Sequence, residues 1–176
     1  MRQLLLNKLE KGLPAITKSM GITFVEAGVY CFHQANHKSG VEIKIEGAFR
    51  TSFEIIWNNQ ITSQLLRTWN NTKEATEYGA VGIAILLIER LLNLTIVMRS
   101  REGTGIDYWL GKMGKNDLPI IKAGLEISGI QEVKGSNTIN ARLTLKKKQV
   151  EKTKQKGIPV YIIVIEFKSP QAKIIK

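Results

Sequence analysis

Two acidic residues in short apolar stretches are the residues of this sequence best suited to chemistry. Asp107 lies in GTGIDYWLG (103–111) and is one of two aspartates among 176 residues, whereas Glu126 lies 19 positions later in LEIS. A carboxylate in a strand is costly unless it is solvated, paired or bound to a cation. Oxygen ligands of this kind suit Mg²⁺ or Mn²⁺, either of which can polarise a phosphodiester and activate water.

The segments around these acids predict an antiparallel meander of three strands between two helices, followed by a further strand. Thr72 can cap the first helix, which is apolar nearly all round, and short turns join the three strands. The last strand is a continuous apolar run, typical of a strand covered on both faces. In chain order the expected elements are helix 73–92, strands 94–100, 106–111 and 118–130, helix 138–156 and strand 158–167.

This order of elements brings carboxylates together at one end of the sheet. Strand 94–100 runs back along the helix before it, so Asp107 should lie near Glu74 and Glu77. The next turn then sets Glu126 opposite Asp107. We therefore expect two or three acidic metal ligands, with Glu77 as the third. Glu77 could instead serve only as a carboxylate at the positive end of the helix dipole.

The order of elements, with Asp107 on the second strand and Glu126 on the third, resembles the PD-(D/E)xK nuclease superfamily over a little more than half of the chain. The resemblance implies an α/β fold with a restriction-endonuclease-like α-β-β-β-α-β core, a mixed sheet flanked by helices. It also implies a metal-dependent phosphodiesterase, a nuclease that acts on DNA or RNA. In that family the two acids bind the metal, and a glutamate of the first helix, here Glu77, can join them.

The lysine that orients the attacking water in this family is replaced here by Ser128. Strand alternation puts Lys122 on the same face as Glu126 and Ser128, and Lys168 follows the apolar strand. Either lysine could supply the missing charge, so the expected catalytic residues are Asp107, Glu126, Lys122 and Lys168. Ser128 keeps an alternative open: a catalytically inactive module of this fold that binds nucleic acid or a protein partner, for example in a mobile-element or defence system.

Structural roles for the two acids also remain open. Asp107 could cap the turn at REGTG or pair with Arg99 or Arg101, and Glu126 could pair with Lys122. Either interaction would satisfy a carboxylate without any metal ion.

The net charge of +11 is concentrated after residue 130, where 11 Lys and Arg face 3 Asp and Glu. A basic helix can follow a phosphate backbone with little sequence preference, so we expect a nucleic-acid partner, DNA rather than RNA. A solvated helix face is the competing interpretation, and a homodimer remains open. The expected nucleic-acid-binding residues are Arg142, Lys146, Lys147, Lys148, Lys152 and Lys154.

The rest of the sequence limits the class of protein. The longest apolar run, 80–88, is too short to span a bilayer, so no membrane partner is expected. One cysteine excludes an internal disulfide and fits the reducing cytoplasm.

Residues 1–71 predict a small α+β portion packed on the nuclease-like core, 72–176. The apolar runs 22–32, 40–47 and 53–57 favour strands, 2–20 a short interrupted helix, and 61–69 a short helix. No chemistry is assigned to this portion.

Overall fold

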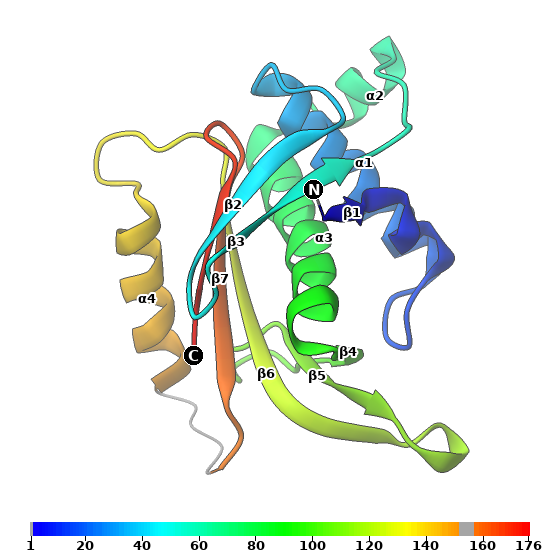
Figure 1. Ribbon diagram of the computed structural model, residues 1–176, viewed down its shortest axis with the longest axis vertical. Coiled ribbons are helices and arrows are strands. Elements are labelled where there is room, and N and C mark those ends of the chain that lie inside the picture. Colours follow the sequence, from blue (N-terminus) through cyan, green and yellow to red (C-terminus); the bar gives the residue numbers. More distant parts are fainter. Residues whose placement is uncertain (1, 152–156) are drawn as a thin grey trace.

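The computed structural model describes residues 2–151 and 157–176 as one mixed β-sheet flanked by helices (Figure 1). The strands are β1 (Gln3–Leu5), β2 (Val41–Gly47), β3 (Thr51–Ile56), β4 (Thr95–Arg99), β5 (Tyr108–Met113), β6 (Pro119–Ile130), β7 (Val160–Glu166) and β8 (Gln171–Ile175). The α-helices are α1 (Lys18–Gln34), α2 (Ser63–Thr68), α3 (Thr72–Leu92) and α4 (Ile139–Glu151), and the 3-10 helices are η1 (Leu6–Lys11) and η2 (Lys115–Asp117). The eight strands lie in the order β1-β3-β2-β8-β7-β6-β5-β4.

The expected meander is present in the half of the sheet that contains β4 to β7. β4 pairs antiparallel with β5, β5 pairs antiparallel with β6, and β7 lies parallel to β6 after the crossover through α4. The α/β class and the flanked mixed sheet are therefore confirmed, as is the expected succession of elements from α3 to β7. β7 also lies inside the sheet, between β6 and β8, as its apolar sequence predicts.

Helix α3 packs against the sheet and against α1. Asn71, rather than the expected Thr72, is its N-cap and accepts a hydrogen bond from the Glu74 N–H at 3.4 Å. The helix ends at Asn93, whose φ of 53° gives the left-handed turn common at helix ends. A Cβ on Gly79 would lie 3.0 Å from the Gly28 Cα of α1, so two small residues allow this close helix crossing.

The expected strand at 22–32 is wrong, because these residues lie within α1. An apolar run without strict alternation fits a buried helix as well as a buried strand, and packing against α3 decides between them here. The hydroxyl of Thr17 starts this helix by accepting the Met20 N–H at 3.3 Å. The predicted interrupted helix over 2–20 is confirmed in part: η1 is a 3-10 helix whose C-cap is Gly12 and α1 begins at Lys18, but residues 3–5 form β1.

The sheet continues through both portions of the chain. β2 lies parallel to β8, with Lys44 beside Gln171, and β8 lies antiparallel to β7. In this way the strands of residues 1–71 extend the sheet of residues 72–176. Within the described part of the chain, no helix has the length and apolar character needed to cross a membrane.

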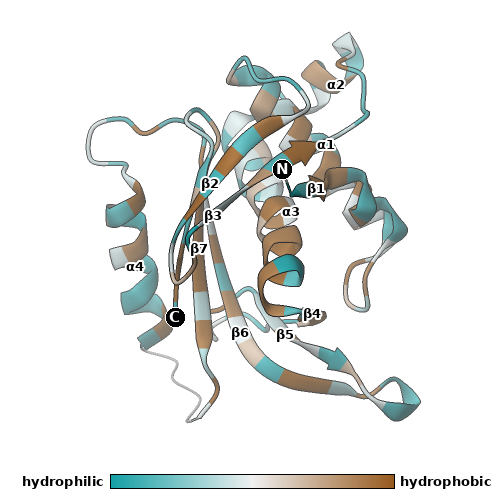
Figure 2. Ribbon diagram, in the orientation of Figure 1, coloured by the Kyte–Doolittle hydropathy of each residue, from teal (hydrophilic) through white to brown (hydrophobic). Residues whose placement is uncertain are grey.

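Helices cover the two faces of the sheet unequally. α1 and α3 lie on one face, and α4 lies on the other (Figure 1). Apolar residues are concentrated on α3 and the central strands, whereas α4 is largely polar (Figure 2). The small core beneath α4 includes Leu143 of the helix and Ile130, Ile162 and Val164 of the sheet.

Candidate active site at the β5–β6 edge

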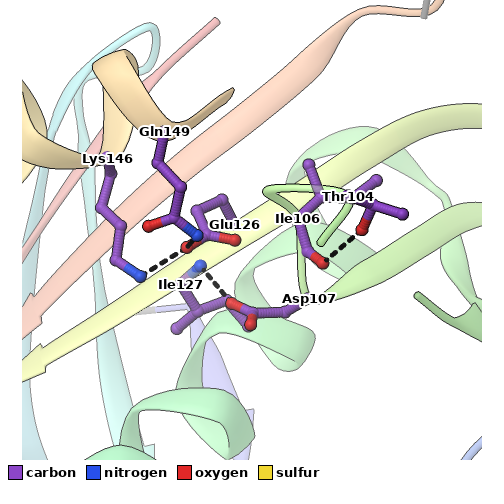
Figure 3. Close-up of polar contacts among 7 residues, drawn as sticks. All are labelled: Thr104, Ile106, Asp107, Glu126, Ile127, Lys146 and Gln149. Carbon is purple, nitrogen blue, oxygen red and sulfur yellow. Dashed lines mark hydrogen bonds and ion pairs between the residues drawn. The ribbon is translucent and has the colours of Figure 1, made fainter. Parts of the chain in front are cut away.

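Asp107 and Glu126 meet across neighbouring strands at the start of β5. The Asp107 N–H donates to the Leu125 carbonyl at 2.9 Å, which extends the β5–β6 register by one residue toward Glu126. Oδ2 of Asp107 also accepts a hydrogen bond from the Ile127 N–H at 2.8 Å (Figure 3). The expected meeting of the two acids is thus present in the structure.

The loop before β5 fixes the position of Asp107. Gly103 and Gly105 adopt φ values of 82° and 69°, which glycine reaches without steric cost. The Thr104 hydroxyl donates to the Ile106 carbonyl at 3.2 Å (Figure 3), and the Ser100 N–H donates to the Asp107 carbonyl at 2.9 Å. Asp107 is therefore positioned by backbone contacts on both of its sides. Neither Arg99 nor Arg101 forms an ion pair with it among the described residues.

Glu126 is a fully buried carboxylate with one satisfied oxygen. Its Oε1 accepts hydrogen bonds from Nζ of Lys146 and, at 3.1 Å, from Nε2 of Gln149, both on α4 (Figure 3). Its Oε2 is buried and has no hydrogen-bond partner among the described residues. Burial and the neighbouring Asp107 raise the pKa of Glu126 to about 7, although Lys146 lowers it. The site therefore has a buried oxygen without a partner beside a second carboxylate.

Two carboxylates in this position repel one another unless a proton or a cation lies between them. Oxygen atoms of Asp and Glu are the ligands that Mg²⁺ and Mn²⁺ prefer, and Mg²⁺ commonly takes only one or two protein carboxylates, with water and phosphate completing its shell. In 2–151 and 157–176, no three His, Cys, Asp or Glu side chains are placed to hold a metal ion together. A metal ion at this position would have the two carboxylates of Asp107 and Glu126 as its protein ligands.

A cavity of about 850 Å³ opens beside Asp107, and its lining includes the first turns of α3, the end of β6 and two residues of α4. Glu74 and Glu77 line it with Asp107, as the sequence predicts. Glu77 is exposed on α3 and does not join Asp107 and Glu126 in a three-residue group, so its expected place in the metal shell is not seen. Four basic residues also line the cavity: Lys73, Arg99, Arg142 and Lys146.

The two lysines expected to replace the missing motif lysine lie elsewhere. Lys122 is exposed in β6 where the register with β5 shifts, about 13 Å along the strand from Glu126 at ~3.3 Å per residue. Lys168 is exposed beyond β7, and neither lysine lines the cavity. The expected place of Lys122 at the site is wrong, because strand alternation gives the face on which a residue lies but not its distance along the strand. Ser128 is buried at the cavity.

Lys146 provides the ammonium group that the other two lysines do not. The sequence predicts it on the outer, phosphate-facing side of its helix, but it points inward to Glu126. The reason is its helical position, since it falls in the stripe of Ile139, Leu143 and Val150 that packs on the sheet. A lysine within an apolar stripe needs a buried partner, and this signal was present in the sequence. Gln149, one turn further on, was missed.

The remaining basic residues of this region differ in their surroundings. Arg142 lines the cavity and donates from Nε to Asn137 Oδ1 at 2.8 Å. Lys147 and Lys148 are exposed on α4, where they are accessible to a partner. Lys152 and Lys154 lie outside the described residues.

The comparisons with known proteins add no relative to this picture. No family model, no curated protein and no solved structure matches the chain. The Asp107–Glu126 pair and its surroundings are therefore the features that bear on function.

Proposed function

We propose that this protein is a metal-dependent phosphodiesterase that cleaves nucleic acid, with DNA as the expected substrate and a restriction-endonuclease-like core. One observation carries the proposal: the buried Oε2 of Glu126 has no partner among the described residues. The same carboxylate lies beside Asp107, and its Oε1 bonds Lys146. Such an arrangement costs stability in a chain that uses it only for packing. A cation held between the two carboxylates, in place of the proton that they would otherwise share, accounts for it.

Asp107 and Glu126 would hold Mg²⁺ or Mn²⁺, which when bound supplies charge to the phosphate and lowers the pKa of a coordinated water. The chain's own residues then perform the remaining tasks. The Ile127 N–H fixes the orientation of the Asp107 carboxylate, and Gln149 fixes that of Glu126. The basic residues around the cavity attract the phosphate backbone and offset its charge.

Lys146 takes the part expected of the motif lysine. Its ammonium group bonds Glu126, which holds it at the carboxylate pair. From there it can stabilise negative charge that develops on the phosphate and orient the attacking water. The position on α4 replaces the usual one on the strand, where Ser128 stands.

A second candidate function is supported by Ser128 together with the Lys146–Glu126 ion pair. The pair already neutralises one of the two carboxylates without a metal, as a structural ion pair would. In that case the protein is a catalytically inactive module that binds nucleic acid or a protein partner.

Cleavage and Mn²⁺ binding, measured together, distinguish the two candidates. We expect plasmid and linear DNA to be cut with Mg²⁺ or Mn²⁺, and Asp107→Asn and Glu126→Gln to lower the rate at least about 100-fold. Isothermal titration calorimetry with Mn²⁺ alone should show that the ion binds to the native protein and not to either variant. Glu132→Gln, an exposed acid after β6, is the matched control and should change neither result.

Native protein that neither cuts DNA or RNA nor binds Mn²⁺ would support the inactive module. Cleavage that persists in Asp107→Asn would place the reaction elsewhere in the chain.

A further inference from the structure

The far end of the β5–β6 hairpin extends beyond the rest of the sheet. β4 begins at Thr95, opposite Gly111 of β5, and β7 begins at Val160, opposite Gly124 of β6. Among the described residues, the end of β5 (112–113) therefore pairs only with β6, and the start of β6 (119–123) pairs only with β5. Figure 1 shows this two-stranded ribbon projecting away from the helices. We call residues 112–122 the β5–β6 arm.

The arm combines positive charge with exposed apolar side chains. Lys112, Lys115 and Lys122 are exposed, and Asp117 is its one acidic residue. The exposed apolar residues of the arm are Met113 at 37%, Leu118 at 65% and Ile120 at 47%. A lone two-stranded ribbon gains little stability from such residues, because nothing within the described chain covers them. Their exposure is typical of a surface that binds a partner.

The tip of the arm is a defined turn. Asn116 and Asp117 both adopt left-handed φ values, 60° and 55°, within η2. The Gly114 N–H donates to the Leu118 carbonyl at 2.8 Å and closes the turn. Leu118 is thus held outward at the end of the ribbon.

We propose that the β5–β6 arm binds duplex DNA, with its lysines on phosphates and Leu118 and Ile120 against the groove. A two-stranded ribbon fits the major groove of B-form DNA, which is about 12 Å wide, whereas the major groove of A-form RNA is too narrow. Lysines bring affinity through phosphates, and apolar side chains can contact base edges in the major groove, such as the thymine methyl group. The inference rests on nucleic acid being the substrate class proposed above.

The spacing between the arm and the candidate active site suits one duplex. Lys112 lies five residues from Asp107 along the strand, about 17 Å at ~3.4 Å per residue. This is about half of a B-DNA turn, which is roughly 34 Å long. The arm would therefore contact phosphates about five base pairs away from the reacting step. Two copies of this chain are less suited to pairing through the arm, because like charges would face one another.

The test is a binding titration of a duplex of about 20 base pairs of DNA in EDTA, followed by fluorescence anisotropy over a range of salt concentrations. The arm variant is Lys112→Ala, Lys115→Ala and Lys122→Ala combined. The control is Lys11→Ala, Lys18→Ala and Lys38→Ala, which removes the same charge from exposed lysines of residues 1–71. Far-UV circular dichroism checks that both remain folded.

We expect the slope of log K against log salt to fall by about 2.7 in the arm variant, at ~0.9 for each phosphate that is no longer neutralised. Its Kd at about 0.1 M salt should rise at least about tenfold, and that of the control less than about threefold. Leu118→Ser with Ile120→Ser should raise Kd several-fold and leave the slope unchanged, because these side chains contact no phosphate.

Equal increases of Kd in the arm variant and the control would overturn the proposal, since net charge alone would then explain binding. An RNA duplex of the same length bound as tightly as the DNA would overturn the groove assignment. A native dimer that the Leu118 and Ile120 substitutions convert to monomer would assign the arm to a second copy instead. Because EDTA removes divalent ions, this test can fail while metal-dependent cleavage succeeds, and the reverse.

Discussion

Replacing Lys146 by methionine removes the ammonium group that neutralises buried Glu126 and keeps an apolar stem of similar length. The Glu126 carboxylate, whose usual pKa is 4.5, has a pKa of about 7 in the folded protein because burial and Asp107 disfavour its charge. The folded chain therefore binds this proton more tightly than the unfolded chain does. This proton contributes about 3 kcal/mol to the free energy of unfolding. The contribution is complete below pH 4.5 and is lost progressively as the pH rises to about 7.

In Lys146→Met the pKa of Glu126 should rise further, because the interaction with Lys146 that lowers it is absent. At about pH 8.5 the variant must then hold an uncompensated buried carboxylate or protonate it against the solvent. Breaking a buried ion pair costs about 3–5 kcal/mol, and the partial exposure of Lys146 favours the lower value. At about pH 5 Glu126 is protonated in both proteins, so the cost should be less than about 1 kcal/mol.

Urea unfolding at about pH 5 and about pH 8.5 in EDTA, followed by circular dichroism, measures this difference. Thermal unfolding should show a decrease in Tm of roughly 6–12 °C at the higher pH, at ~2–4 °C per kcal/mol for a chain of this size. Lys147→Met, at the next and exposed position of α4, is the control and should change stability by less than about 0.5 kcal/mol. Adding Glu126→Gln to Lys146→Met should restore most of the stability at the higher pH.

An equal cost of Lys146→Met at both pH values would show that the destabilisation comes from lost packing and not from the charge of Glu126. A double variant no more stable than Lys146→Met alone would show that the charge of Glu126 is not the cause.

Two further predictions concern the packing around α3. Gly129→Ala would place a Cβ 2.5 Å from the Thr76 carbonyl oxygen and 2.9 Å from the Ala80 Cβ. It should therefore lower the free energy of unfolding, measured in urea, by about 1–3 kcal/mol. Unchanged stability would show that α3 can move away freely. Burial raises the pKa of Cys31 to about 12, so its thiol should resist Ellman's reagent at about pH 8 in the native protein and react in urea; rapid labelling of native protein would contradict its burial.

The part of the fold that carries the candidate site follows well from the sequence. The alternating and apolar runs of β4 to β7 and the turns between them lead directly to the meander and to the meeting of Asp107 and Glu126. These contacts join residues that are near in sequence, so local patterns define them. The helix α1 did not follow, because an apolar run that is buried all round carries no period that separates helix from strand.

The lysine of the site required a different kind of information. Lys146 and Gln149 reach Glu126 from a helix on the far side of a crossover, so strand alternation could not place them. The clue was a charged residue in the apolar stripe of α4, which is visible only once the inward face of the helix is identified. β8 was missed because five residues after a turn give too short a pattern, although they pair on both sides.

The pairing of β8 between β7 and β2 has a consequence for how the chain folds. The two carboxylates are brought together by a hairpin, whose ends find one another quickly, whereas Lys44 and Gln171 must meet across most of the chain. Contacts between such distant segments are the slow part of folding, because the entropy of closing a long loop must be overcome first. We therefore expect β5 and β6 to pair early and the two halves of the sheet to join in the rate-limiting step.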